Sequence, residues 1–349
     1  MSEMERTDGC DRVVARAGGI KVLDLFAGCG ALSHGFLQAG GFKIMGACQW
    51  EADRPWIART FQRNHFGTEL VDADITLPET KDRICGIFKD SHCDVVIGGP
   101  PCVAYSMAGR RDPNDPRGRL FEDYLAIVGV LRPPVIVMEN VVGILSRRKG
   151  EDEPPIRRIV AGLVGLGYRV EFRVLNAADF GVPQCRRRVI IIGTRLDVPI
   201  RFPMPTHAEQ PDFFGEALPW VTVRDALADL VDAPEDRNFW HVFVRSSPGF
   251  LDRIRRTPPG KSASIGYHEV FQRLSADRPS ITVKGANGGV PIHYSLDRLI
   301  TPREMARLQG FPDSFQFLGA KGDVLLMIGN AVPVGLAQAV ACGVKEMLG

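Results

Sequence analysis

Two side chains capable of covalent and acid-base chemistry each follow a strand-like segment of the chain. Cys102 comes directly after the turn Gly98–Pro101, which follows the apolar run Asp94–Ile97. Glu139 follows a second apolar run, Val135–Met138. Because glycines permit a sharp turn and prolines stiffen it, we expect the thiol to be presented at the carboxyl end of a strand. A thiol and a carboxyl group at two strand ends are typical of nucleophilic catalysis with an acid partner.

Strand-like and helix-like segments alternate through the first half of the chain. Near-continuous Val/Ile runs joined by helical segments predict a parallel sheet that is covered on both faces. We expect strands over Val22–Phe26, Lys43–Cys48, Asp94–Ile97, Val135–Met138, Tyr168–Leu175 and Arg188–Thr194, and helices over Leu32–Ala39, Trp56–Asn64 and Leu120–Leu131. The predicted fold class is therefore α/β, with a doubly wound, mostly parallel sheet.

The texture of the sequence changes after Leu196. Five prolines fall between Val198 and Trp220, and the periodicity of the apolar residues fades. We interpret this change as the passage into a second, smaller and irregular domain. Helical patterns return over Thr301–Gln309 and Gly335–Leu348. The expected division is a first domain of residues 1–196, completed by residues 320–349, and a second domain of residues 197–319.

Length and composition exclude several classes of protein. The 349 residues are 45% hydrophobic and 24% charged, which is ordinary for a soluble globular protein, and their formal charge is only +2. The eight cysteines include no C-x-x-C pair and no zinc-like spacing with histidine, which favours a reducing cytoplasm and no metal site. The N-terminus does not resemble a signal peptide, and no apolar run approaches about 18 residues, so we expect no membrane partner.

Positive charge is concentrated in one part of the chain. Residues 245–284 contain eight lysines and arginines against three acidic residues. Taken alone, this excess of five charges fits a solvated face as well as it fits a surface for phosphates. The basic residues are Arg245, Arg253, Arg255, Arg256, Lys261, Arg273, Arg278 and Lys284.

A turn rich in small residues, Asp24–Gly30, follows the first predicted strand. Such a turn lets backbone N–H groups approach a negatively charged ligand at the start of a helix. Because the spacing is not G-x-G-x-x-G, both a dinucleotide and an adenosyl cofactor with a carboxylate are candidates. Glu51 can bind ribose hydroxyls, Asp74 can take the amino group of an adenine, and Trp50 can pack near the base.

Six motifs in a fixed order resemble those of the bacterial DNA (cytosine-5) methyltransferases. They span nearly the whole chain and are Asp24–Gly30, Gly99–Cys102, Glu139–Val141, Gln184–Arg188, Arg303–Pro312 and Gly329–Pro333. The resemblance implies the class I methyltransferase fold with a small target recognition domain, and a last helix that returns to the first domain. It also selects S-adenosylmethionine over a dinucleotide as cofactor and implies double-stranded DNA as partner, without a metal.

The resemblance further implies roles for individual residues. Cys102 attacks carbon 6 of cytosine, and Glu139 bonds its ring nitrogen 3 and amino group. Arg186 and Arg188 are two apart on a strand, so both face one side. The resemblance implies that they support this carboxylate and the target base. The implied cofactor-binding residues are Phe26, Gly28, Gly30, Trp50, Glu51, Asp74, Ile75, Gly99, Pro101, Leu120, Asn330 and Val332. The implied DNA-binding residues, in the loop after Cys102 and in a recognition loop over Thr282–Gly289, are Ser106, Arg110, Arg111, Arg117, Arg119, Lys284, Gly288 and Gly289.

Three alternatives compete with this interpretation. An RNA cytosine-5 methyltransferase would share the fold, but the long stretch between Arg188 and Arg303 favours a DNA-acting enzyme. The glycine spacing disfavours a nicotinamide-dependent dehydrogenase. The presence of Cys102, Glu139, Arg186 and Arg188 disfavours a DNA-binding protein without activity. We expect a monomer that resides in the cytoplasm.

Overall fold

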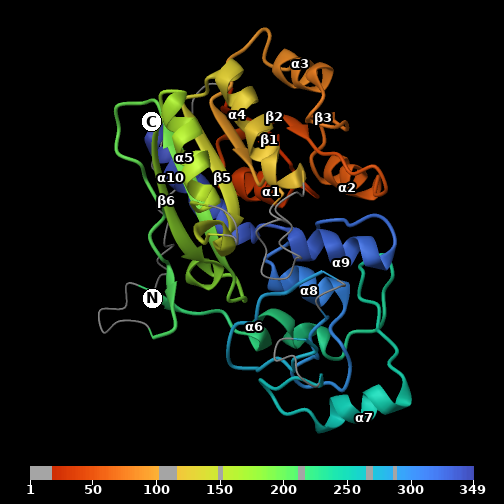
Figure 1. Ribbon diagram of the computed structural model, residues 1–349. Coiled ribbons are helices and arrows are strands. Elements are labelled where there is room, and N and C mark those ends of the chain that lie inside the picture. The colour runs from red at the N-terminus through yellow and green to blue at the C-terminus, as the bar shows by residue number, and fades with distance from the viewer. Residues whose placement is uncertain (1–17, 102–115, 148–151, 211–216, 265–269, 286–288) are drawn as a thin grey trace, which may run out of the picture.

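A seven-stranded sheet forms the centre of the computed structural model, which describes residues 18–101, 116–147, 152–210, 217–264, 270–285 and 289–349. The strand order is β3-β2-β1-β4-β5-β7-β6, and β7 alone runs antiparallel to its neighbours (Figure 1). The strands are β1 (Ile20–Leu25), β2 (Phe42–Cys48), β3 (Glu69–Val71), β4 (Val95–Gly98), β5 (Val135–Val141), β6 (Arg169–Asn176) and β7 (Arg187–Thr194). This confirms the predicted α/β fold with a mostly parallel sheet.

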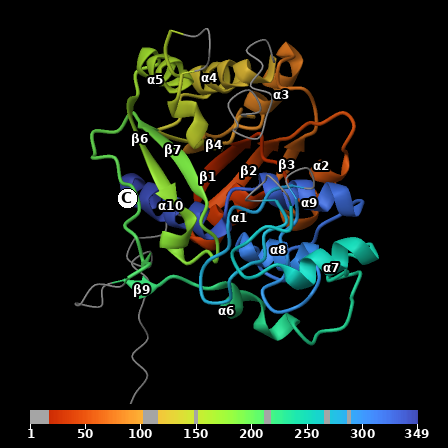
Figure 2. The ribbon, with the colours of Figure 1, turned by 60° about the horizontal axis from the view of Figure 1, so that its bottom comes forward.

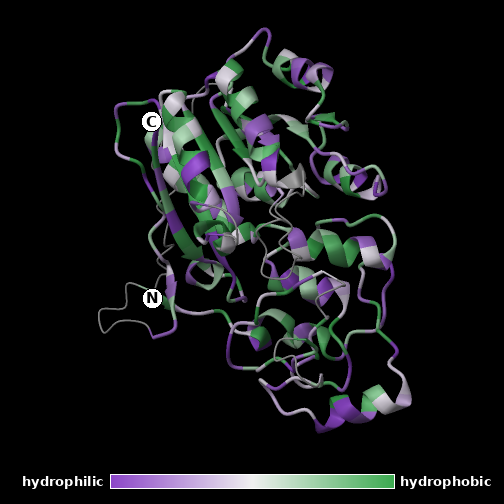
Figure 3. Cartoon of the chain, in the orientation of Figure 1, coloured by the Kyte–Doolittle hydropathy of each residue, from purple (hydrophilic) through white to green (hydrophobic). Residues whose placement is uncertain are grey.

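Apolar residues alternate between the two faces of the sheet, and each face packs against a different set of helices. Val22, Ile97 and Val137 belong to a cluster with α1 (Ala31–Gln38) and α10 (Val334–Leu348). The intervening residues, such as Leu23 and Val96, pack with α3 (Pro78–Gly86), α4 (Leu120–Leu131) and α5 (Pro155–Gly165). Figure 2 shows α3, α4 and α5 above the sheet and α1 and α10 below it. Because both faces are buried, the central strands are almost wholly apolar (Figure 3).

A second unit with little regular structure surrounds another hydrophobic cluster, which also includes Cys29, Ala31 and Ile57 of the first domain. Its helices are α6 (Val223–Leu227), α7 (Pro248–Arg256), α8 (Pro302–Leu308) and α9 (Lys321–Asn330), and the linker before it contains the short pair β8 (His207–Ala208) and β9 (Leu218–Pro219). Val324 and Ile328 of α9 belong to this second cluster, whereas Leu336 and Val340 of α10 belong to the sheet. We therefore propose that the boundary between the two domains lies between α9 and α10, rather than before residue 320.

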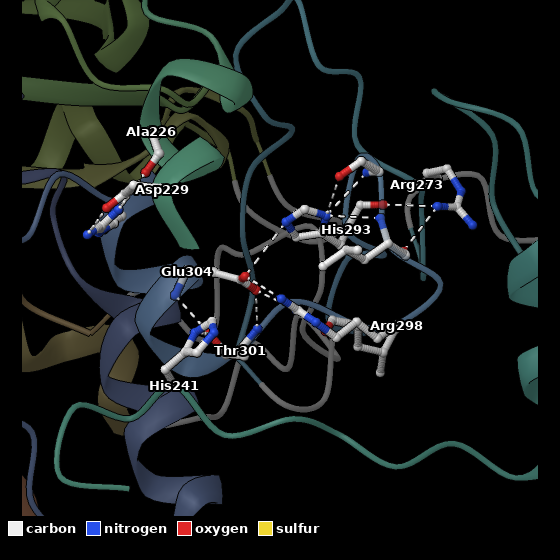
Figure 4. A network of polar contacts seen from close by, with 12 residues as sticks. Ala226, Asp229, His241, Arg273, His293, Arg298, Thr301 and Glu304 are labelled. Atoms are coloured by element: carbon white, nitrogen blue, oxygen red, sulfur yellow. Dashed lines mark hydrogen bonds and ion pairs between the residues drawn. The ribbon is translucent and has the colours of Figure 1, made fainter. Parts of the chain in front are cut away.

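A buried polar network holds the irregular second unit together. The carboxylate of Glu304 is fully buried, and both of its oxygens accept hydrogen bonds from Arg298, at 2.6 and 2.8 Å (Figure 4). The same carboxylate accepts the backbone N–H of Thr301 and caps α8, and the hydroxyl of Thr301 lies 3.1 Å from Nδ1 of His241. Since a buried carboxylate is costly unless it is paired, this network fixes how the segment of His241 meets residues 298–304.

Most predicted elements lie where the sequence placed them, and two helices agree to the residue. These are α2 (Trp56–Asn64) and α4. β5 extends three residues beyond the prediction, through Val141, because Glu139, Asn140 and Val141 continue its pairing with β7. α3, α5 and α9 were not predicted. Among the described residues one helical stretch, Lys321–Leu348, is apolar and long enough to span a membrane, but 72% of its 18-residue apolar window is buried within the fold.

Candidate active site

Three of the motifs meet at the carboxyl ends of β1, β4 and β5, which are neighbours in the sheet. After β1 the chain turns toward β2 on one side, and β4 starts the other half of the sheet, so β1 and β4 border the topological switch point. Ligands of open α/β sheets bind in the crevice at this point. The turn after β1, the Gly-Pro-rich turn after β4 and the end of β5 therefore define the candidate site.

Close backbone approaches explain the two glycines that end β4 and follow it. A Cβ atom on Gly98 would lie 2.4 Å from the carbonyl oxygen of Leu25, and a Cβ atom on Gly99 would lie 3.1 Å from Oε2 of Glu139. Asn140 Nδ2 also donates a hydrogen bond of 3.3 Å to the carbonyl oxygen of Pro100. The turn that leads to residue 102 is thus attached to the end of β5, beside the carboxylate. Cys102 itself lies outside the described residues.

The carboxylate of Glu139 forms an ion pair with Arg188 from the adjacent strand. Arg188 Nε lies 2.9 Å from Glu139 Oε1, and the two side chains are 12% and 13% exposed. Burial raises the pKa of Glu139 above its ordinary value of 4.5, while the guanidinium groups of Arg188 and Arg186 act in the opposite direction. A buried acid with a raised pKa is suited to donate a proton to a substrate.

Arg186 is expected to support this carboxylate together with Arg188, and its charge acts on the pKa of Glu139. Its side chain also binds two backbone carbonyl groups. Its side chain is 2% exposed and donates to the carbonyl oxygens of Val283, at 2.9 Å, and Gly329, at 2.8 Å. Arg186 therefore joins the sheet to two segments that lie far from it in sequence. Arg187 points the other way and is exposed.

The turn after β1 has a left-handed backbone at three positions. Phe26, Gly28 and Gly30 have φ values of 60°, 58° and 94°. A Cβ atom on Gly30 would lie 2.2 Å from Nε2 of His65, whereas one on Gly28 would meet nothing within 4 Å. Gly30 is thus required by packing within the protein, and Gly28 faces open space at the switch point.

The acidic residues expected near a cofactor lie at the ends of β2 and β3. Trp50 is 48% exposed, and Glu51 is exposed with its carboxylate 3.4 Å from Nε of Arg54. Asp74 is half-buried and accepts bonds of 2.9 Å from the N–H and the hydroxyl of Thr76. The remaining expected positions are buried in the case of Ile75 and Val332, half-buried for Pro101 and Leu120, and exposed for Asn330 at the end of α9.

Comparison with known proteins identifies the family of the chain. Residues 20–346 match the C-5 cytosine-specific DNA methylase family. The type II methyltransferase M.NgoPII of Neisseria gonorrhoeae is 35% identical over 346 residues, which cover 94% of this chain and 96% of that protein. The type II methyltransferase M1.HphI of Haemophilus parahaemolyticus is 34% identical over 340 residues, or 93% and 86% of the two chains. The chain belongs to the C-5 cytosine-specific DNA methylases.

Solved structures agree with the fold of this methylase. A DNA modification methyltransferase encoded within a prophage of E. coli superposes with a TM-score of 0.76 at 26% identity, over 94% of this chain and 99% of that one. The Dnmt2 methyltransferase of S. pombe gives a TM-score of 0.60 at 18% identity, over 94% and 98%, and this likeness concerns the fold alone. The predictions of a cytosine-5 DNA methyltransferase and of its class I fold are confirmed.

The residues expected to contact DNA are only partly within the described part of the methylase. Ser106, Arg110, Arg111 and Gly288 lie outside it, and so does the side chain of Arg117. Arg119 is exposed, Lys284 is half-buried, and Gly289 has a φ of 77°.

One member of the basic stretch has a different role from the one expected. Arg273 is 6% exposed and donates to the carbonyl oxygens of Ile254, Thr257 and His293 and to Asp297. Figure 4 shows Arg273 beside His293. Its guanidinium group is buried and its N–H donors bind acceptors inside the protein, so it is not available to a phosphate. In contrast, Arg253, Arg255 and Arg256 on α7 are exposed.

Two buried amides of the site were not singled out from the sequence. Gln184 is fully buried, and its Nε2 donates to Oε1 of Gln309 at 2.8 Å and to the carbonyl of Leu308 at 2.9 Å. Gln309, equally buried, donates to the carbonyl of Ile328 at 2.6 Å. Their membership of the fourth and fifth motifs was visible in the sequence, but nothing local indicated that one binds the other.

Proposed function

We propose that this methylase transfers a methyl group from S-adenosylmethionine to carbon 5 of a cytosine flipped out of double-stranded DNA, with Cys102 as the nucleophile. The observation that carries the proposal is the position of the Glu139–Arg188 ion pair beside Gly99, in the turn that leads to Cys102. This arrangement supports a site in which a thiol and a proton-holding acid act on the same base.

The chemistry divides between Cys102 and Glu139. The Cys102 thiolate adds to carbon 6 of the cytosine, and the electron pair displaced from the 5,6 double bond makes carbon 5 nucleophilic. Glu139 donates a proton to ring nitrogen 3 and accepts a hydrogen bond from the amino group, which stabilises the ring as the thiolate adds. After carbon 5 has gained its methyl group, it loses its proton to water and the 5,6 double bond re-forms as Cys102 leaves as a thiolate. Ring nitrogen 3 then returns its proton to Glu139.

The residues at the ends of β1, β2 and β3 fit an adenosyl cofactor. Gly28 faces open space, which leaves room for a ligand against the backbone, and Trp50 offers an exposed aromatic surface. The carboxylates of Glu51 and Asp74 suit ribose hydroxyls and an amino group. When bound, S-adenosylmethionine supplies an electrophilic methyl group on a positively charged sulfur. The expected contacts of Phe26, Gly30, Ile75, Gly99, Pro101, Leu120, Asn330 and Val332 belong to this proposal.

Duplex DNA is the proposed substrate, rather than RNA. The second unit, between β7 and α10 in the chain, supplies a surface for reading bases. A cytosine can reach the acid and thiol only after leaving the helix, at a cost of a few kcal/mol. Two relatives of this chain are named type II methyltransferases, which supports a modification enzyme that accompanies a restriction enzyme. We also propose that it acts as a monomer.

A covalent trap tests this proposal. Incubation with duplex DNA that contains 5-fluorocytosine and with S-adenosylmethionine is expected to leave protein covalently bound to the strand, since fluorine at carbon 5 cannot leave as a proton does. Cys102→Ser is expected to abolish both the adduct and methyl transfer. Cys85→Ser, a change in a cysteine of α3, serves as the matched control and is expected to preserve both. Methyl transfer by Cys102→Ser at the wild-type rate would disprove the mechanism.

A further inference from the structure

A short segment of the second unit, Ser280–Gly285, lies along the entrance to β7. Ser280 donates its N–H to the carbonyl of Pro183 at 2.9 Å and accepts the N–H of Cys185 at 2.8 Å. Thr282 donates its hydroxyl to the carbonyl of Cys185 at 2.9 Å. These bonds connect the segment that leads into the expected recognition loop directly to the sheet.

Both backbone polar groups of Val283 are held by side chains from the same motif. The N–H of Val283 donates to Oε1 of Gln184 at 2.8 Å, and its carbonyl accepts from Nη1 of Arg186 at 2.9 Å. Gln184 is fully buried and Arg186 is 2% exposed. Water cannot replace either bond at such positions, so loss of one side chain leaves a buried peptide group unsatisfied.

The next residues are held from the opposite side by the end of α9. A Cβ atom on Gly329 would lie 2.1 Å from the backbone nitrogen of Gly285, so the two backbones cross without room for a side chain. Arg186 binds the carbonyl of this same Gly329 at 2.8 Å. The chain entering the loop is therefore fixed between β7 and α9 up to Gly285.

We propose that Gln184 and Arg186 are positioning residues that fix the start of the recognition loop, and that the base selectivity of methylation depends on them. The inference rests on the proposed function, in which the loop over Thr282–Gly289 reads bases. Arg188, two residues beyond Arg186, binds Glu139. One short segment therefore positions both the start of the loop and the carboxylate of Glu139. Discrimination between bases depends on the geometry of each base contact, and a displaced loop would lose that geometry.

The test compares selectivity among variants whose folding is also measured. The recognition sequence is first obtained by methylation-sensitive sequencing of DNA from cells that express the protein. Selectivity is the ratio of kcat/KM on that duplex to kcat/KM on a duplex with one base pair changed. Gln184→Met and Arg186→Lys are expected to lower this ratio about tenfold, mainly through KM for the preferred duplex, with the affinity for S-adenosylmethionine unchanged.

A control separates positioning from general loss of stability. Thr301→Val removes a buried hydroxyl that caps α8 in the same unit, and it touches neither Val283 nor Gly329. It is expected to lower the melting temperature and leave the selectivity ratio unchanged. If the Gln184 and Arg186 variants do not fold, Thr282→Val at the partly exposed edge of the segment decides, with an expected threefold fall in the ratio.

The outcomes distinguish this inference from the proposed function. Wild-type selectivity in every variant that folds would overturn the positioning role while leaving the covalent mechanism intact. Failure of the wild-type protein to form the 5-fluorocytosine adduct would instead overturn the proposed function on which the inference rests.

Discussion

Arg188 lies diagonally across two antiparallel strands from Glu139, with 2.9 Å between Nε and Oε1. Because Arg188 stands opposite Val141 in the register, its side chain emerges on the same face of the sheet as that of Glu139. The pairing of β5 with β7 thus orients the acid, and an isolated strand end could not do so.

Removal of this partner is expected to impair catalysis and to change its pH dependence. Arg188→Met should lower kcat roughly 100-fold, the range for loss of one preorganised polar contact. The cation favours ionised Glu139, so its loss raises the pKa of that carboxyl further. The protonated acid then persists to higher pH, and the alkaline limb of the kcat profile shifts upward. Arg187→Met, at the exposed neighbour on the opposite side of β7, should change neither quantity.

The two glycines of the turn after β1 are expected to respond differently to alanine. Gly30→Ala should destabilise the fold by about 2 kcal/mol or more, because the new methyl group overlaps His65 at a left-handed position. Gly28→Ala should cost only about 1–2 kcal/mol of backbone strain. Its methyl group faces open space, so the affinity for S-adenosylmethionine should fall at least about tenfold, as measured by calorimetry.

A double variant sharpens this comparison. Gly30→Ala combined with His65→Ala should recover part of the lost stability, since the clash is with the His65 ring. If the double variant loses as much unfolding free energy as the two single variants lose together, the packing explanation of Gly30 is wrong.

The buried Asp24 is expected to make the stability of the fold depend on pH. Burial raises the pKa of Asp24 from 3.8 to about 7, against a hydrogen bond of 2.6 Å from Ser33. The folded protein therefore keeps a proton that the unfolded chain releases between about pH 4 and 7, and the free energy of unfolding falls as pH rises through that window.

Asp24→Asn isolates this contribution. Between pH 5 and pH 7.5 the wild-type protein should lose about 3 kcal/mol more unfolding free energy than the variant, measured by urea denaturation. His65, whose pKa burial lowers to about 4, gives a slope of the opposite sign, but it does so in both proteins and cancels in the difference. Parallel pH profiles for the two proteins would contradict the raised pKa.

Basic residues of residues 245–284 are expected to separate into two classes. Arg278 is exposed close to Ser280, so Arg278→Ala should weaken DNA binding and reduce the slope of log K against log salt by about 1. Arg273→Met should leave that slope unchanged. It should lower the free energy of unfolding by about 3 kcal/mol or more, because buried carbonyl oxygens lose their hydrogen-bond donor. A reduced salt slope in Arg273→Met would show that it also contacts phosphates.

The sheet and its strand-end motifs could be predicted because buried parallel strands require continuous apolar runs. α4 was located to the residue for the same reason, since its periodicity and its flanking breaks are local. The second unit was expected to be irregular, but the course of its chain could not be predicted, because it depends on bonds such as those of Arg273 to Thr257 and Leu296, 16 and 23 residues away. Such side-chain bonds to carbonyls follow no period.

The same limit applies to the candidate site. The strand contexts of Cys102 and Glu139 suggested their roles, and Cys102 lies outside the described residues. The burial of Gln184 was not predicted, because its partners Val283 and Gln309 lie 99 and 125 residues away. A lone glutamine in a polar stretch resembles a surface residue until the second unit is in place. The division of labour between Arg186 and Arg188 was hidden in the same way.

The packing of α10 against α1 has a consequence for the synthesis of the enzyme. Among the described helices, α1 and α10 lie far apart in the sequence and cover the same face of the sheet, so that face remains exposed until α10 has been synthesised and has packed onto it. A nascent chain from which Cys102 and the second unit have already emerged therefore still lacks the helix that completes this face of the sheet. We therefore expect methyltransferase activity only after α10 has left the ribosome and packed against α1.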